Sequence, residues 1–359
     1  MEKKNTWETY SSKQLKELEK INAQYRDFLD NGKTERECID TIVNTIEKSG
    51  YRELESLIKE GAALKTGDKV YSVWMNKSIA MFQIGRKPMT EGMNILGAHI
   101  DSPRLDVKQN PLYEDGGFAY LDTHYYGGVK KYQWVTIPLA IHGVIVKKDG
   151  TCVEINIGEN EDDPVFFVSD LLIHLAQEQL EKKAAKVIEG EALDIIVGNK
   201  PLLIDKKDKK KDEKEAGKEA VKAGVLDILK ETYDIREEDF VSAELEIVPA
   251  GKAREAGFDR SMTLAYGQDD RVCAYTSMQA MLDSDVTDRT MCCILVDKEE
   301  IGSVGATGMQ SHFFENAVAE VMNLTGEYSE LHVRRCLAHS CMLSSDVSSA
   351  FDPTYASSF

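Results

Sequence analysis

Apolar residues recur at three- and four-residue intervals in the first part of the chain, as one face of an amphipathic helix requires. This pattern covers residues 12–28 and again residues 34–48. Short, largely apolar runs of the kind that forms strands follow, at residues 69–74, 78–84 and 93–98. The order predicts two helices followed by a sheet.

After Asp101 the chain becomes rich in strand-like segments that are separated by Gly- and Asp-rich turns. The predicted strands are residues 105–108, 118–121, 134–140, 143–146 and 152–157. We also predict a helix near residues 168–183, and a solvated loop over residues 205–222, where eight lysines are interleaved with six acids. This region is interpreted as a β-rich insertion.

Alternating helix and strand patterns return from about Gly257. Residues 271–282 and 311–322 have helical periodicity, and residues 290–296 form an apolar run typical of a buried strand. Because 359 residues exceed what one hydrophobic core usually serves, two domains are expected. We therefore predict an α/β fold in which residues 1–101 and 258–359 form the main domain and residues 102–257 an inserted, β-rich one.

Composition narrows the function classes. The 62 acidic residues outnumber the 44 basic ones, and the formal charge of −18 makes nucleic acid and anionic lipid poor partners. No apolar stretch approaches the roughly 20 residues of a membrane span. The N-terminus has no signal-peptide pattern, and the seven cysteines show no paired spacing. We expect a cytoplasmic protein with reduced thiols and no membrane association.

Two polar motifs lie at predicted element boundaries in the first and third parts of the chain. His99 and Asp101 follow the predicted strand 93–98, where an imidazole could bind zinc while the carboxylate orients the ring. Asp269 and Asp270 precede a predicted helix and could bind metal or cap the helix. Taken alone, each motif also fits a structural role: a buried histidine and an N-terminal cap.

Two further acidic motifs follow apolar segments. Glu299 and Glu300 come after the predicted strand 290–296, and one could ligate a metal while the other acts as general base. Asp346 ends a second apolar segment. Individually, these motifs also fit a charged surface and a turn. Together, four such motifs around one α/β sheet are what a two-metal hydrolase needs.

The ordered set resembles the aspartyl aminopeptidase family, cytoplasmic exopeptidases with two zinc ions per site. The matching motifs are Gly-Ala-His-x-Asp-Ser-Pro at 97–103, Asp-Asp at 269–270, Glu-Glu-x-Gly-Ser at 299–303 and Ser-x-Asp at 344–346. Each motif is common by itself, but their order and approximate spacing are specific, and the match covers essentially the whole chain. The resemblance implies a zinc-aminopeptidase-type sheet with flanking helices.

The resemblance also implies a set of metal ligands. His99 and Asp346 would hold the first zinc ion, Asp269 would bridge the two ions, and Glu300 would bind the second. The peptide bond after the bridging aspartate is cis in this family, which predicts a cis bond between Asp269 and Asp270. Zinc is the expected cofactor.

The implied reaction is release of the N-terminal residue of a peptide, with an acidic residue as the expected substrate. Glu299 would be the general base for a metal-bridging water, and Asp101 would orient His99. Residues 102–257 resemble the family's dimerisation domain, through which dimers assemble into a dodecamer. His174 matches the histidine that reaches from this domain into a neighbouring subunit's active site.

Family members continue beyond Phe359, and the additional stretch carries one more metal-ligand histidine. We therefore expect weak occupancy of the second metal position and poor activity for this polypeptide. One alternative is a truncated, catalytically impaired member that serves as a non-enzymatic assembly subunit. Another is a related deacylase that acts on N-acyl amino acids, although the motifs fit it less well.

Overall fold

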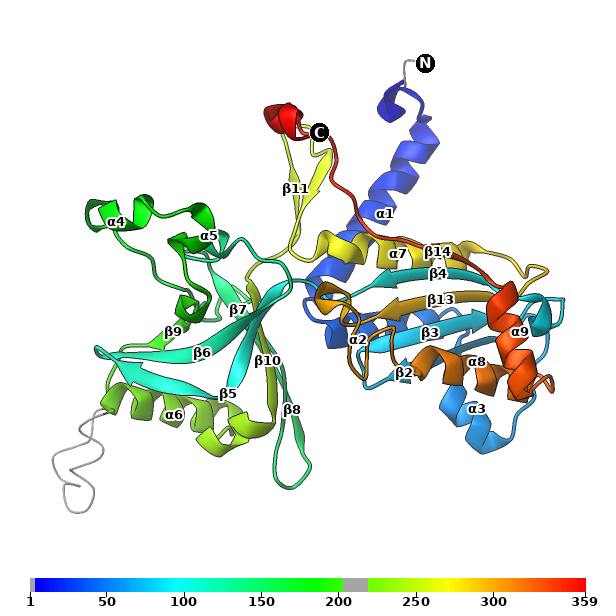
Figure 1. Ribbon diagram of the computed structural model, residues 1–359, viewed down its shortest axis with the longest axis horizontal. Coiled ribbons are helices and arrows are strands. Elements are labelled where there is room, and N and C mark those ends of the chain that lie inside the picture. Colours follow the sequence, from blue (N-terminus) through cyan, green and yellow to red (C-terminus); the bar gives the residue numbers. More distant parts are fainter. Residues whose placement is uncertain (1–3, 203–218) are drawn as a thin grey trace. The chain divides into compact units, whose positions relative to one another are not determined.

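A computed structural model describes residues 4–202 and 219–359, which divide into two compact units (Figure 1). Unit 1 comprises residues 1–102 and 253–359, and unit 2 comprises residues 103–252. The second boundary therefore lies at 252/253 and not at the expected 257/258. The reason is a hairpin of β11 (Arg254–Ala256) and β12 (Met262–Leu264), which joins residues 253–257 to unit 1.

Unit 1 is built on a six-stranded sheet in the order β1-β2-β3-β13-β4-β14. Strand β13 pairs in parallel with β4, and β4 pairs in parallel with β14, whereas β2, β3 and β13 form antiparallel pairs. The bounds are β1 Arg52–Glu53, β2 Lys69–Trp74, β3 Ser78–Gln83, β4 Asn94–His99, β13 Met291–Val296 and β14 Cys341–Ser344. The strands predicted at residues 69–74, 78–84, 93–98 and 290–296 are confirmed.

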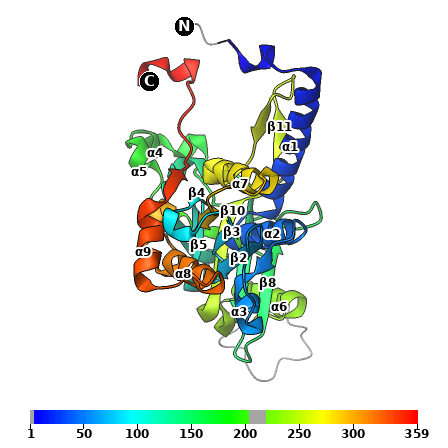
Figure 2. The ribbon, with the colours of Figure 1, turned by 90° about the vertical axis from the view of Figure 1, so that its right-hand side faces the viewer.

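Helices cover both faces of this sheet, with α1 and α2 on one side and α8 and α9 on the other (Figure 2). The bounds are α1 Ser12–Asn31, α2 Glu35–Glu47, α3 Leu54–Glu60, α7 Gln268–Asp283, α8 Phe313–Leu324 and α9 Glu330–His339. The first two helices begin with capping boxes, formed by Ser11 with Gln14 and by Thr34 with Glu37. The four helices predicted for this unit are confirmed.

Unit 2 contains a six-stranded antiparallel sheet in the order β8-β7-β10-β5-β6-β9. Its bounds are β5 Arg104–Asp115, β6 Phe118–Tyr126, β7 Leu139–Val146, β8 Cys152–Ile157, β9 Ile195–Gly198 and β10 Ala243–Pro249. Most of the predicted strands are confirmed, but residues 134–138 lie outside β7. The predicted loop at 205–222 falls largely on residues 203–218, which lie outside the described part of the chain.

The helix predicted at residues 168–183 is wrong. The chain forms only a 3-10 turn at Ile173–Leu175 and the short helices α4 (Gln177–Leu180) and α5 (Ala184–Val187). Most of the apolar residues that suggested an amphipathic face are exposed, including Leu172 at 62% and Leu175 at 72%. Helical periodicity without a surface to pack against does not sustain a helix of this length.

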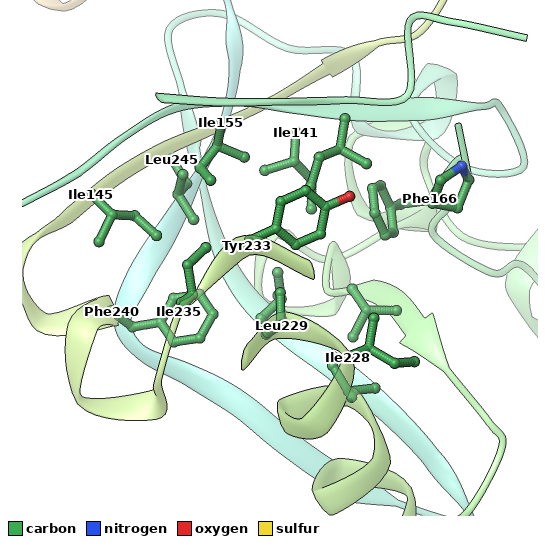
Figure 3. A pocket seen from close by; sticks show the side chains of 15 residues that line it. Ile141, Ile145, Ile155, Phe166, Ile228, Leu229, Tyr233, Ile235, Phe240 and Leu245 are labelled. Atoms are coloured by element: carbon green, nitrogen blue, oxygen red, sulfur yellow. The ribbon is translucent and has the colours of Figure 1, made fainter. Parts of the chain in front are cut away.

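An apolar cavity of about 230 Å³ lies in unit 2, between α6 (Ala220–Tyr233) and the sheet (Figure 3). Ile141, Leu229 and Leu245 are among the side chains that line it, and Tyr233 contributes a ring to its wall. Among the described residues, no helix is both long and apolar enough to cross a bilayer. All seven cysteines are free thiols, as expected.

Candidate metal centre

The candidate centre lies in unit 1, where the parallel strands β4, β13 and β14 end at the same edge of the sheet. His99 is the last residue of β4 and is in register with Val296, the last residue of β13. Glu299 follows β13 by three residues, and Asp346 follows β14 by two. Because parallel strands present their carboxyl ends together, these separate motifs meet in space.

His99 is the focus of the cluster. It is only 3% exposed, and its Nε2 lies 3.4 Å from Asp269 Oδ1, 3.7 Å from Glu299 Oε2 and 3.9 Å from Asp346 Oδ1. Donor atoms of His99, Asp269 and Asp346 all lie within 4.8 Å of one another. The three carboxylates are about half exposed, so the centre is open to solvent on their side.

Asp101 is fully buried and connects His99 with the segment after β13. Its Oδ1 lies 3.3 Å from His99 Nδ1, and its backbone carbonyl oxygen lies 3.0 Å from the same nitrogen. Its two carboxylate oxygens also accept hydrogen bonds from the backbone N–H groups of Glu299 and Glu300, each at 3.2 Å. Asp101 therefore orients the ring so that Nε2 faces the other acids, and it holds the backbone that carries Glu299.

Electrostatics at the cluster favour a positive charge. Burial lowers the pKa of His99, but the hydrogen bond and charge of Asp101, with a contribution from Asp270, raise it to about 9. Burial raises the pKa of Asp270 to about 6. Without a cation, the imidazole itself carries the charge that the surrounding carboxylates attract.

The turn before α7 places Asp269. The peptide bond between Asp269 and Asp270 is cis, as predicted. Gly267 precedes it at φ 77°, and a Cβ at this position would collide with the Arg271 guanidinium. Ser102 Oγ donates a hydrogen bond to the backbone carbonyl of Asp269 at 2.6 Å. Asp270, which the sequence suggested as a metal ligand or a helix cap, is buried beside this turn and is not in the group of donor atoms that includes His99, Asp269 and Asp346.

Two predicted site residues, Glu300 and His174, are not part of the cluster of acids around His99. Among the described residues, Glu300 does not belong to the group of donor atoms around His99, although its backbone is held by Asp101. His174 lies in unit 2, is exposed, and sits in the 3-10 turn Ile173–Leu175. Its predicted action in a neighbouring subunit stays a prediction.

The residues present fit a zinc ion. A neutral imidazole nitrogen and carboxylate oxygens are zinc ligands, and the Asp101 carboxylate beside Nδ1 favours the tautomer that leaves Nε2 available. Three carboxylates around one buried nitrogen repel one another, and a bound cation would relieve this repulsion as the protonated imidazole does. The donor set therefore fits a metal ion.

Comparison with known proteins agrees with this chemistry. The family described as aminopeptidase I zinc metalloprotease (M18) matches residues 28–359. A probable M18 family aminopeptidase 1 of Clostridium acetobutylicum is 61% identical over 354 residues, which cover 99% of this chain and 74% of the relative. A corresponding relative from Thermotoga maritima is 42% identical over 356 residues and is covered to 74%.

Solved structures have the same fold. The crystal structure of an M18 family aminopeptidase from Thermotoga maritima matches with a TM-score of 0.90 and 42% identity over 99% of this chain and 74% of that one. Aminopeptidase I from Clostridium acetobutylicum matches with a TM-score of 0.85 and 58% identity over 98% of this chain and 74% of that one. The chain therefore belongs to the M18 family of aminopeptidases and is a zinc metalloaminopeptidase.

Proposed function

We propose that this aminopeptidase releases an acidic N-terminal residue, Asp or Glu, from peptides, with Glu299 as its general base. The observation that carries the mechanism is the convergence of Asp269, Glu299 and Asp346 on His99 Nε2. The preference for an acidic residue is supported by the family resemblance of the motifs. Because the relatives are aminopeptidases, a non-enzymatic assembly role is not favoured.

His99, Asp269 and Asp346 would hold one zinc ion, and Glu300 would join Asp269 at a second. Zinc, when bound, polarises the peptide carbonyl and makes water more acidic. Asp101 keeps the His99 ring in place through its contact with Nδ1. With these residues assigned to the metal ions and to the orientation of His99, one carboxylate of the cluster remains for proton transfer.

Glu299 is the residue left for proton transfer. Its carboxylate reaches the edge of the cluster and is 46% exposed, so it can meet both water and substrate. It takes a proton from the attacking water and passes it to the leaving amine when the peptide bond breaks. Positioned proton transfer of this kind typically contributes about 10² to 10⁴ in rate.

We also propose that the protein self-associates and is located in the cytoplasm. Leu171, Leu172 and Ile173, with exposures of 53%, 62% and 63%, lie next to His174 in unit 2. Exposed apolar residues gathered in one segment are typical of an interaction surface, which supports a role for this unit in assembly. The seven free thiols are compatible with a reducing compartment.

The first test is metal content per chain by elemental analysis after dialysis, combined with hydrolysis of unblocked aspartyl, glutamyl and leucyl anilides. Glu299→Gln should keep its metal and lose about 10² to 10⁴ in kcat. The N-acetylated forms of the same substrates serve as the control for a deacylase. Full activity of Glu299→Gln would remove Glu299 as the base, and faster hydrolysis of leucyl than of aspartyl and glutamyl substrates would overturn the acidic preference.

A further inference from the structure

The loop that follows β13 carries Glu299 but has few apolar contacts of its own. Ile301 and Val304, its apolar residues near the tip, are 47% and 59% exposed. Lys298 and Gly302 both have positive φ, at 72° and 89°, so the chain turns sharply on either side of Glu299. A loop of this kind keeps its position through polar contacts rather than through packing.

Buried hydrogen bonds tie the two ends of this loop together. Thr307 Oγ1 donates to Asp297 Oδ2 at 2.6 Å, across ten residues of chain. Ser78 Oγ, from the start of β3, donates to the Thr307 carbonyl at 2.6 Å and accepts from the Asp297 backbone N–H at 3.2 Å. All three residues are buried, with exposures of 6%, 0% and 0% for Thr307, Asp297 and Ser78. We call these three residues the loop clamp.

The loop clamp acts directly on the turn before Glu299. Asp297 Oδ1 accepts a hydrogen bond from the backbone N–H of Lys298 at 2.8 Å, and Lys298 Nζ lies 3.7 Å from Asp297 Oδ2. Asp297 is therefore fixed through its backbone and through both carboxylate oxygens. Because Lys298 occupies the left-handed conformation immediately before Glu299, a shift of Asp297 moves the backbone of the base.

We propose that Thr307 is a positioning residue for the aminopeptidase reaction, which it serves by holding Asp297 and with it the loop that carries Glu299. This inference rests on the proposed role of Glu299 as base. Asp101 fixes Glu299 from the side of His99, and the loop clamp fixes the same segment from the sheet interior. Both attachments are needed because a displacement of about 1 Å at a reacting group can cost on the order of 100-fold in rate.

The test compares two buried threonines near opposite ends of β13. Thr307→Val keeps the shape but removes the donor to Asp297, and Thr307→Ser keeps that donor. Thr290→Val is the matched control, because Thr290 is 1% exposed and its Oγ1 accepts from the Gly85 N–H at 3.0 Å, near the beginning of the strand. For each variant, kcat and KM, zinc content and hydrogen exchange at the amides of residues 298–306 are measured.

Thr307→Val should lower kcat by roughly 10- to 100-fold with zinc content unchanged, and exchange at 298–306 should become faster. Thr307→Ser should restore both, and Thr290→Val should change neither, although it lowers thermal stability. Equal kcat for Thr307→Val and wild type, or an equal loss in Thr290→Val, would overturn the proposal. If Thr307→Val does not fold, Ser78→Ala provides the same test from the other side of the loop clamp.

The outcome is separable from that of the proposed function. Activity of Glu299→Gln reports on the base itself, whatever Thr307 does. If Glu299→Gln is inactive and Thr307→Val is fully active with unchanged exchange, the base assignment stands and the positioning role is wrong.

Discussion

Two of the seven histidines are buried in this protein, one in each unit. His99 ends β4 in unit 1, and His142 lies within β7 in unit 2. Each has a carboxylate within hydrogen-bond or ion-pair distance: Asp101 Oδ1 at 3.3 Å from His99 Nδ1, and Glu159 Oε1 at 3.2 Å from His142 Nε2. Burial beside an acid therefore does not distinguish a metal ligand from a structural histidine.

The positions of the two histidines in their sheets distinguish them. His99 Nε2 faces three acids that arrive from the ends of other elements of unit 1. His142 lies in the middle of a sheet, in register with Asn156 on β8 and with Glu246 on β10. A strand end lets loops from several strands contribute polar groups, whereas a strand interior surrounds a side chain with its sheet neighbours.

The largest effect is expected from changing His99, and it tests the difference between the two histidines directly. His99→Gln should lose zinc and with it the aminopeptidase activity, because it removes the nitrogen on which the acids converge. The loss of zinc affinity should exceed the roughly 10- to 100-fold that follows from removing a residue that only orients a ligand. Zinc per folded chain, measured by elemental analysis, and anilide hydrolysis are the readouts.

His142→Gln is the matched control and should keep its zinc. It changes a partly buried hydrogen bond to Glu159, which costs about 1–3 kcal/mol of stability if the remaining partner is left unsatisfied. Loss of zinc from folded His142→Gln to the same extent as from His99→Gln would show that the two histidines are not as different as their surroundings suggest.

The sequence predicts where the polar residues at this end of the sheet lie, because His99, Glu299 and Asp346 stand in short motifs at or just after the ends of apolar strands. It predicts less where distant residues meet. Thr307 and Asp297 form a buried bond that depends on the path of the loop, and nothing near Thr307 in the chain indicates it. The failed helix at 168–183 shows the converse, since a regular apolar pattern is informative only if its face becomes buried.

The next effect concerns stability in unit 2. Leu245 is 5% exposed on β10 and lines the apolar cavity (Figure 3), so Leu245→Ala should enlarge that cavity and cost about 2–5 kcal/mol of unfolding free energy. Zinc content of the folded protein should not change. For Leu245→Ala, hydrogen exchange resolved by peptide should become faster in unit 2. Leu57→Ala, at a buried position of α3, is the control and should make exchange faster in unit 1.

A smaller effect is expected from changing the acid beside each buried histidine, Asp101 or Glu159. Asp101→Asn leaves one acceptor oxygen where two carboxylate oxygens receive the N–H groups of Glu299 and Glu300, and it removes the charge beside His99. Zinc affinity should fall by roughly 10- to 100-fold. Glu159→Gln, the corresponding change beside His142, should leave zinc affinity at the wild-type value, and competition with a chelator measures both.

The smallest effect is expected from adding an apolar group to the cavity of unit 2. Val225 on α6 lines the cavity, and Val225→Ile adds one methylene group where about 230 Å³ of space is present. Burial of one methylene contributes about 0.8 kcal/mol, which corresponds to a rise in Tm of about 2 °C for a unit of this size. Val241→Ile is the control, because Val241 is 59% exposed in the same unit and gains no burial. A rise in Tm for Val225→Ile alone would show that unit 2 has room for apolar groups. A fall would mean that its interior is already close-packed, because an extra methylene group destabilises a core that has no space for it.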